Sequence, residues 1–261
     1  MAAWVLAVWT LRRRSSGDTV GIAMTSPDRE TVARKLAHAH DVKPLDDRWS
    51  RSGSELVVMG RIAFYRASER PYGAFSNLFR RPVTVAGTEF PTVEHAYQSL
   101  KPRDPRVRAW LLAAPAPSLV AIAAHVLPSD EPDPSLVMGR AADSLLGFHT
   151  RPGWSRLRYP WMLQCLDAKF DQHQDLGDLL LATGSAEIVE AGTIDDEAGR
   201  RWGIVNGRGC NYLGRMLTRV RAKLSGRTHP DADLDVRLAF GADALATALL
   251  SNTGGSLDGV R

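Results

Sequence analysis

Cysteine is scarce in this sequence: its 261 residues include only Cys165 and Cys210. Two cysteines do not build a disulfide framework, and this pair does not have the spacing of metal ligands. We therefore expect each to behave as a small buried apolar residue. A reducing, cytoplasmic setting is the default expectation for such a chain.

Long hydrophobic runs are also lacking. The apolar stretch within residues 1–11 is too short to span a bilayer. Its positive charges, Arg12, Arg13 and Arg14, follow it, whereas a secretory signal has them first. We therefore expect no membrane partner.

Several motifs of common enzymes are absent. The sequence has no Walker or dinucleotide-binding fingerprint and no Ser/His/Asp order, and its seven histidines are scattered without metal-ligand spacing. We expect neither a metal nor a cofactor. The charge is also close to balance: a formal net charge of +4 and a pI of about 9.3 are compatible with a phosphorylated or nucleic-acid partner but require neither.

What the sequence does contain is a hydrophobic fraction of 44%, enough for a sizeable core. We expect a flexible N-terminal extension over residues 1–60, a single compact domain over 61–224, and a partly helical or disordered extension over 225–261. Apolar periodicity and turn residues predict helices and strands. The predicted helices cover 26–40, 92–101, 104–114, 118–127, 135–148, 161–170, 175–183, 211–224 and 238–250, and the predicted strands cover 62–65, 188–191 and a hairpin over 82–90. The fold class is therefore mainly α with a few short strands (α+β).

The helix predicted over residues 92–101 carries the first candidate site. Thr92 is suited to cap its N-terminus, and an apolar stripe leaves Glu94, Gln98 and Lys101 together on the neighbouring flank. A carboxylate, an amide and an ammonium along the rim of a buried face can support catalysis. The alternative is a solvated flank with one Glu–Lys pair, which is a common surface feature.

The second candidate site is the segment 202–211. Its glycines, Gly203, Gly207 and Gly209, let the backbone approach a ligand closely, and the segment leads to the N-terminus of a helix capped by Asn211, where anions bind. Arg208 can bind phosphate, and Trp202 offers a flat face to a base. The alternative is a tight turn beside a core tryptophan.

The third candidate is the loop with Ser76 and Asn77. An asparagine in a loop more often bonds the local backbone than a ligand, so the residues alone leave both interpretations open.

Together these stretches resemble one family. The blocks Gly73–Phe79, Glu94–Lys101, Lys169–Gly184 and Trp202–Gly214 occur in the order found in NADAR-domain proteins, a group that includes bacterial riboflavin-biosynthesis-intermediate N-glycosidases. The resemblance covers about residues 62–224. It implies a compact, mainly helical fold and an enzyme that breaks N-glycosidic bonds to ribose.

The resemblance also implies roles for individual residues. Glu94 and Lys101 match the family's catalytic pair. The positions that match its substrate pocket are Ser76, Asn77, Gln98, Trp202 and Asn211. Two positions depart from the family pattern: Pro102 replaces an aromatic residue, and Gly199 replaces an acidic one. A short insertion would bring Asp196 into the acidic role.

We therefore expect an N-glycosidase that hydrolyses the ribose C1–N bond of a small phosphorylated ribosyl compound. Bond breaking builds positive charge on the sugar, which Glu94 would stabilise while it orients a water. Lys101 would donate a proton or hydrogen bond, or attack C1 as an amine. Asn77 and Asn211 would hold ribose hydroxyls. The alternatives are an ADP-ribosyl glycohydrolase acting on guanine in DNA or RNA, and a non-catalytic NAD- or ADP-ribose-binding module.

Overall fold

The computed structural model describes residues 60–114, 116–125, 150–192 and 195–253. The predicted helices over 26–40 and 135–148 lie outside these residues. The described chain divides into two compact units, which are treated separately below. One comprises residues 60–97 and 155–253, and the other comprises residues 98–154.

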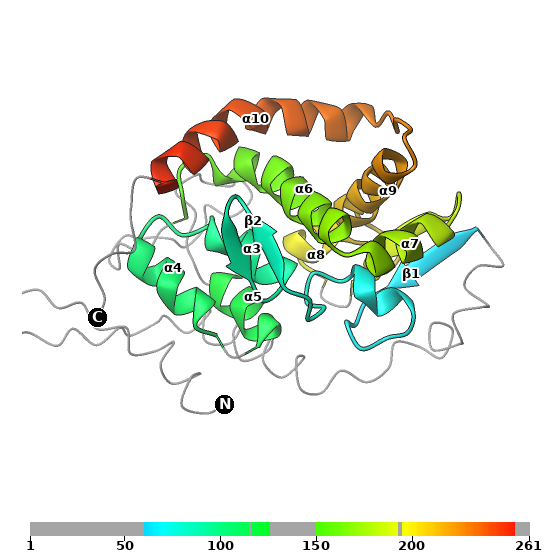
Figure 1. Ribbon diagram of the computed structural model, residues 1–261, viewed down its shortest axis with the longest axis horizontal. Coiled ribbons are helices and arrows are strands. Elements are labelled where there is room, and N and C mark those ends of the chain that lie inside the picture. The colour runs from blue at the N-terminus through cyan, green and yellow to red at the C-terminus, as the bar shows by residue number, and fades with distance from the viewer. Residues whose placement is uncertain (1–59, 115, 126–149, 193–194, 254–261) are drawn as a thin grey trace, which may run out of the picture. The chain divides into compact units, whose positions relative to one another are not determined.

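The first unit contains a small parallel sheet (Figure 1). Strand β1 (Arg61–Phe64) pairs with β4 (Glu187–Glu190), with Ile62 opposite Ile188 and Phe64 opposite Glu190. The side chains of Ile62, Phe64 and Ile188 are almost fully buried. Helix α9 (Tyr212–Leu224) packs on β4 through the apolar stripe that the sequence predicts. Both strands are confirmed to within one residue.

The hairpin is also confirmed. Strands β2 (Val83–Val85) and β3 (Thr88–Phe90) pair antiparallel. Ala86 and Gly87, at the turn between them, have φ of 49° and 78°. Two central residues with positive φ are typical of the type I′ turn, whose twist suits a two-residue hairpin. The hairpin leads directly into α3 (Val93–Ser99), which ends two residues before the predicted end.

Helix α6 (Trp154–Gln172) is longer than predicted. The sequence suggests a start at Trp161 because Pro160 precedes it and proline normally interrupts a helix. In the structure Pro160 lies inside the helix. Helix α7 (Gln174–Ala182) follows, beginning one residue before the predicted start at 175, with His173 as its N-cap. Asp175 lies in the first turn and pairs with Arg81 at 2.7 Å.

The remaining helices of this unit are α8 (Glu197–Trp202), which the sequence did not reveal, and α10 (Ala232–Thr253), which begins six residues before the predicted 238. A 3-10 helix, η2 (Tyr72–Phe75), precedes the loop with Ser76 and Asn77. The largest fully buried side chains of the unit include Phe64, Phe75, Phe170, Met162 and Leu166. The charged side chain of Lys169 is also fully buried.

The second unit contains α4 (Pro105–Leu112) and α5 (Pro117–His125), which pack on each other. Pro105 opens α4 as predicted, and Val107 and Leu111 are buried on its apolar stripe. Residues 100–102 are joined to residues 150–151 by backbone contacts: Arg151 donates its N–H to the Lys101 carbonyl at 2.7 Å. No helix in the described part of the chain is both long and apolar enough to cross a membrane. The described fold is mainly helical with a few short strands, as predicted.

Candidate active site

Glu94 lies in the first turn of α3 and is 8% exposed. The predicted cap is present: the Thr92 hydroxyl accepts from the backbone N–H of His95 at 3.3 Å. The next turn is held by Trp161 on α6, whose indole N–H donates to the carbonyls of Ala96 and Tyr97, at 3.1 Å each. A helix of only seven residues is marginal alone, so these contacts keep the carboxylate in place.

Glu190, at the end of β4, provides a second carboxyl group, and the sequence did not single it out. It is partly buried. Burial, and after it the negative charge of Glu94, raise the pKa of Glu190 from 4.5 to about 7. The same two causes raise the pKa of the buried Cys165 thiol. Because burial and the nearby charge of Glu94 both disfavour the ionised form, Glu190 is protonated in a substantial share of the molecules at neutral pH.

Asn77 connects its loop to the same helix, since its carbonyl accepts from the Glu94 N–H at 3.0 Å. Its side-chain Nδ2 donates to Met162 Sδ at 3.4 Å. Its Oδ1 is buried and has no hydrogen-bond partner among the described residues. An unpaired buried acceptor costs free energy, so a ligand hydroxyl would satisfy it. The neighbouring Ser76 hydroxyl is used locally, accepting from the Leu78 N–H at 3.3 Å.

Lys169 on α6 binds the backbone of the loop that contains Ser76 and Asn77. Its Nζ donates to the carbonyls of Ala74 and Ser76, at 2.5 and 3.0 Å. The ring centroids of Phe79 and Phe170 lie 5.7 and 5.4 Å from the same atom. Lys169 is 1% exposed, and burial lowers its pKa from 10.5 to about 7. The two hydrogen bonds need only the two N–H groups of a neutral amine.

Trp202, the predicted stacking residue, ends α8 and is partly exposed. Its ring contacts Tyr97 edge-on, with centroids 5.6 Å apart, and Tyr159 at 5.8 Å. Burial strongly raises the pKa of the Tyr97 hydroxyl, an effect that the positive charge of Arg158 opposes. Arg158 lies on α6, and its guanidinium carbon is 5.9 Å from the Tyr159 ring centre.

In segment 203–211, two of the three predicted glycines pack against backbone. A side chain at Gly203 would lie 2.4 Å from the Glu190 carbonyl oxygen, and one at Gly209 would lie 2.0 Å from that of Gly203. These glycines therefore let backbone approach backbone. Asn206 and Gly207 form a turn with φ of 50° and 76°, which leaves Arg208 exposed. For these residues the tight-turn alternative fits the geometry.

Asn211 occupies the predicted N-cap position of α9, but its side chain does not cap the helix. Its Oδ1 accepts from the Glu190 N–H at 3.1 Å, and its Nδ2 donates to the Ile188 carbonyl at 2.8 Å. The amide thus bonds the backbone of β4 as a neighbouring strand would, beside Ile204, whose N–H donates to the Glu190 carbonyl at 2.8 Å. Its effect in the described structure is to fix the backbone of Glu190.

The remaining predicted residues lie on α3, just after α3 and at the start of α8. Asp196 caps α8, accepting from the Gly199 N–H at 2.7 Å. Gln98 is buried in the last turn of α3. Lys101 is partly buried, and its Nζ donates to the Ala124 carbonyl at 2.5 Å. Among the described residues, no group of three or more His, Cys, Asp or Glu side chains is arranged to hold a metal ion.

Comparisons with known proteins identify the family of this chain. The family model of the NADAR domain matches residues 63–225. N-glycosidase YbiA of Shigella flexneri is 34% identical over 165 residues, which cover 63% of this chain and 88% of that protein. N-glycosidase Npun_R5314 of Nostoc punctiforme is 30% identical over 167 residues, which cover 62% of this chain and 92% of that protein. The NMR structure of Escherichia coli YbiA superposes with a TM-score of 0.50 at 30% identity, covering 66% of this chain and 90% of that one.

A more distant relative is the riboflavin biosynthesis protein PYRR of Zea mays. It is 26% identical, over 66% of this chain but only 26% of its own length. The fold and these relatives place the chain in the class of N-glycosidases, hydrolases that act on N-glycosyl compounds. The chain belongs to the NADAR domain family.

Two residues of this site escaped sequence reasoning. Glu190 was visible only as the acidic end of an apolar strand, after Ile188 and Val189. Lys169 was visible only as part of a family block. In both cases the sequence shows a charged residue at the end of a run of buried apolar residues or within it. Whether such a residue is functional depends on the side chains that the fold brings beside it.

Proposed function

We propose that the protein hydrolyses the ribose C1–N bond of a phosphorylated ribosyl compound of the riboflavin-intermediate type. The observation that carries this proposal is that Glu190 of β4 lies near Glu94 of α3, whose charge helps to raise the pKa of Glu190 to about 7. Asn77 contacts the same helix through the backbone N–H of Glu94. A carboxyl group whose pKa is raised beside a second carboxylate is suited to the acid role in such a pair. The names of the family relatives support the same reaction type.

In this mechanism C1 gains positive charge as its bond to nitrogen breaks, and the Glu94 carboxylate stabilises that charge. Protonated Glu190 donates its proton to the departing nitrogen. Water then adds its hydroxyl to C1, and its remaining proton returns to Glu190. One water molecule is consumed, and no change of oxidation state occurs. Asn77 Oδ1 would accept from a ribose hydroxyl.

Lys101 has two candidate roles. It can donate a hydrogen bond to the substrate, or its neutral amine can attack C1, expel the nitrogenous group and form an imine with the opened ribose that water later hydrolyses. Borohydride distinguishes them. If the imine forms, it traps substrate on the wild-type protein but not on Lys101→Ala; no adduct during turnover would leave only the hydrogen-bonding role.

For the phosphate we propose Arg158 in addition to Arg208. Arg158 is partly buried near Tyr97 and Tyr159. Its Nε donates to the Ser155 carbonyl at 3.1 Å, and none of the ion pairs among the described residues includes it. A guanidinium without a carboxylate partner is suited to bind phosphate. Arg208, by contrast, extends from an exposed turn.

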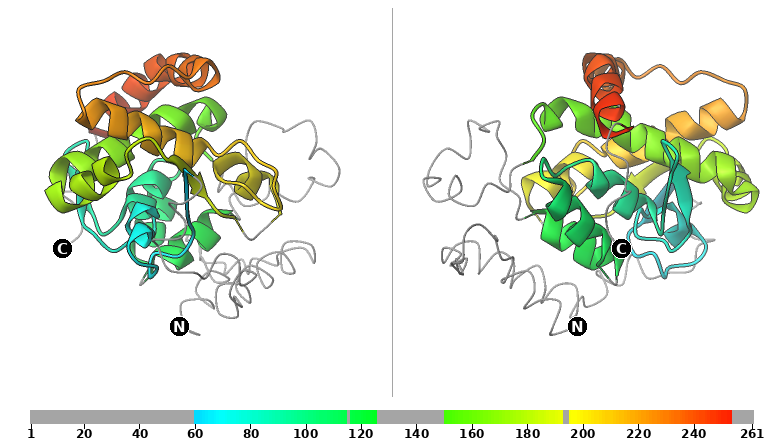
Figure 2. Two further views of the ribbon diagram at one scale, coloured as in Figure 1. Left: turned by 90° about the vertical axis from the view of Figure 1, so that its right-hand side faces the viewer. Right: turned by 60° about the vertical axis from the view of Figure 1, so that its left-hand side comes forward.

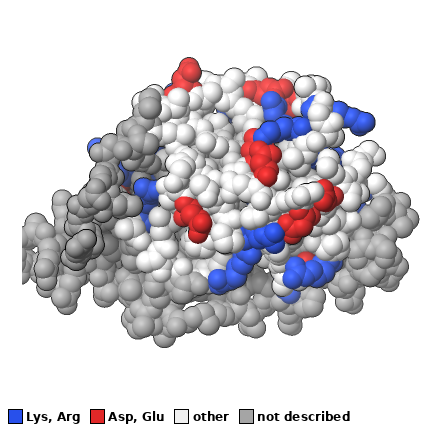
Figure 3. Space-filling model, in the orientation of Figure 1, with Lys and Arg blue, Asp and Glu red and all other residues white. Residues whose placement is uncertain are grey.

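The ADP-ribosylated guanine of a nucleic acid remains the second candidate substrate. Strands of nucleic acid are typically bound along a continuous basic groove. On the face seen in Figure 3, blue and red side chains are interspersed among uncharged atoms rather than gathered by sign. That arrangement favours the small substrate.

The test is a product assay by chromatography and mass spectrometry. The purified protein is offered a phosphoribosyl-aminopyrimidine and, separately, an ADP-ribosylated guanine oligonucleotide, with Glu94→Gln as the inactive control. We expect ribose 5-phosphate and free base from the first. Free ADP-ribose from the second alone would replace the proposed substrate with the nucleic acid. Binding of ADP-ribose with neither reaction would make the protein a binding module.

A further inference from the structure

The C-terminal helix α10 lies beyond residues 63–225, which the family model matches. In Figures 1 and 2 it runs beside α6 and above α9 in each view. The contacts below connect it to both helices, and one of its residues connects it to the aromatic cluster around Trp202.

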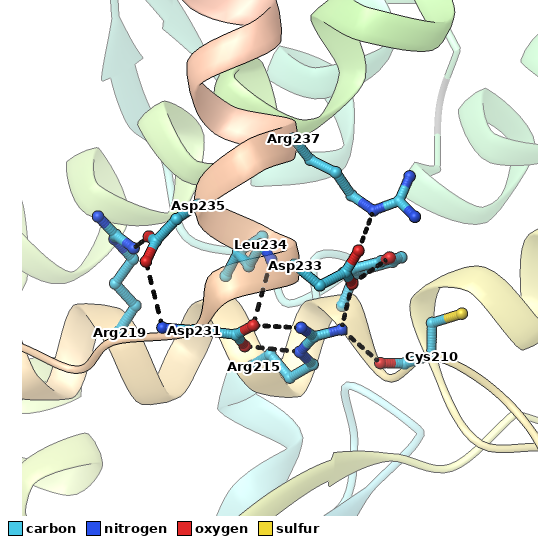
Figure 4. A network of polar contacts seen from close by, with 9 residues as sticks. Cys210, Arg215, Arg219, Asp231, Asp233, Leu234, Asp235 and Arg237 are labelled. Atoms are coloured by element: carbon cyan, nitrogen blue, oxygen red, sulfur yellow. Dashed lines mark hydrogen bonds and ion pairs between the residues drawn. The ribbon is translucent and has the colours of Figure 1, made fainter.

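The first turn of α10 is anchored to α9 by charge pairs (Figure 4). Arg215 binds Asp231 with two nitrogens and Asp233 at 3.0 Å. The Tyr212 hydroxyl donates to Asp233 Oδ2 at 2.6 Å. These bonds fix the start of α10 relative to Tyr212.

Further along, α10 approaches α6 closely at Gly241. A side chain there would lie 2.3 Å from the Arg156 carbonyl oxygen and 2.8 Å from Pro160 Cγ. Only glycine fits such an approach, so the position of α10 along α6 is set. Pro160 removes a helical hydrogen bond from α6, and α10 covers the turn where it does so.

Between these two anchors, Arg237 reaches the aromatic cluster. Its guanidinium carbon lies 4.9 Å from the Tyr212 ring centre and 5.3 Å from that of Tyr159, and Asp233 orients it at 3.1 Å. The two tyrosine rings are 5.1 Å apart, and Tyr159 is 5.8 Å from Trp202. A guanidinium over aromatic faces is an attractive arrangement that restrains the rings.

We propose that α10 contributes to substrate binding by positioning aromatic side chains of the site. Arg237 acts as a positioning residue: it holds Tyr159 and Tyr212, and through Tyr159 it sets the ring of Trp202 on which the substrate base stacks. The proposal rests on the proposed function in one respect, the stacking role of Trp202. It gives the chain an extension that shapes base recognition rather than one that merely lengthens the fold.

The test compares Arg237→Ala with Arg237→Lys, which keeps the cation, and with Arg219→Ala. Arg219 is the matched control: it pairs with Asp235 of α10, and in the described part of the chain its guanidinium does not lie over either tyrosine ring. We expect Arg237→Ala to raise KM by about fivefold to tenfold while kcat changes by less than about twofold, the pattern of a lost binding interaction. Arg237→Lys should restore most of the affinity, and Arg219→Ala should leave KM unchanged.

A double-mutant cycle with Trp202→Phe separates positioning from general destabilisation. If Arg237 acts through Trp202, Arg237→Ala adds little to KM in the Trp202→Phe background. Equal effects in both backgrounds would overturn the proposal. Thermal melting under assay conditions confirms that every variant is folded.

A readout without turnover keeps this test independent of the proposed substrate. The fluorescence spectrum of wild type minus that of Trp202→Phe isolates the emission of Trp202. Arg237→Ala should shift this difference spectrum, and Arg219→Ala should not. If no substrate is turned over, the proposed function fails while this result still decides the inference; an unshifted spectrum in Arg237→Ala would overturn the inference alone.

Discussion

Two clusters of charged residues lie in the same unit of this molecule and behave in opposite ways. Around the candidate site, burial moves the pKa values of Glu190 and Lys169 to about 7. Between α9 and α10, pairing with arginines lowers the pKa values of Asp231 and Asp235, and hydrogen bonding to Asp231 raises that of Arg215.

The difference lies in solvent and partners rather than in residue type. Asp231 retains an exposed side chain fraction of 14% and is bonded to Arg215, so charge is matched by charge. Lys169 is buried against carbonyls and aromatic rings, and Glu190 lies near another carboxylate. Matched charges stay ionised and hold helices together, whereas buried groups without a counter-ion can change protonation at neutral pH, which acid–base catalysis requires.

The largest effect is expected for Glu94→Gln. The change keeps the size of the side chain but removes the charge that stabilises the sugar cation, so turnover should fall by about 1000-fold. The melting temperature should change little. The assay follows release of the free base, with Glu89→Gln on the exposed face of β3 as the control. Turnover within tenfold of wild type would remove Glu94 from the mechanism.

Glu190→Gln should lower turnover by about 100-fold and alter its pH dependence. In wild type, the acid must be protonated, so kcat/KM should fall as pH rises through about 7. The variant should lose this alkaline limb. Glu187→Gln, on the same strand but paired with Arg61 near the surface, should keep it. An unchanged profile in Glu190→Gln would show that another group titrates.

These two carboxylates also show how far the sequence reaches. Glu94 could be predicted because its helix, cap and apolar stripe are all local patterns. Glu190 could not, because its raised pKa arises only when β4 brings it near Glu94. Similarly, the hairpin at Ala86 and Gly87 follows from local turn preferences, whereas the start of α6 depends on how the helix accommodates Pro160.

Segment 202–211 also shows a limit of prediction from the sequence. Trp202 contacts the rings of Tyr97 and Tyr159. Asn211 and Gly203 have the residue types of a ligand site, yet their nearest groups are the backbone of β4. Spacing alone cannot distinguish a backbone that approaches a ligand from one that approaches another strand.

Lys169→Met should change stability in a pH-dependent way. The folded-state pKa of Lys169 is about 7, below its ordinary 10.5, so the unfolded state binds more protons between these values. Wild-type stability should therefore rise with pH across this window, and the stability contributed is lost as pH falls through about 7. In urea unfolding, the free energy of unfolding of the wild type should rise by a few kcal/mol across this pH window, and that of Lys169→Met should not. An identical slope in the variant would mean that Lys169 does not titrate there.

The smallest effect belongs to the paired cluster. Arg215→Ala should lower the free energy of unfolding by about 1 kcal/mol, as expected for partly exposed ion pairs. Its turnover should keep the wild-type pH profile, since Asp231 and Asp233 remain ionised at neutral pH. Denaturation in low and high salt checks the cause, because the loss should shrink as salt screens the pairs. A displaced pH optimum would break the distinction between the clusters.

The most direct measurement of that distinction is a ¹³C NMR titration of the glutamate side-chain carboxyls in the wild-type protein and in Glu94→Gln. The account predicts one carboxyl, assigned to Glu190 by its loss in Glu190→Gln, that titrates near 7 in wild type and at lower pH once the Glu94 charge is removed. A Glu190 carboxyl that titrates at its ordinary pKa, or that is unaffected by Glu94→Gln, would contradict it.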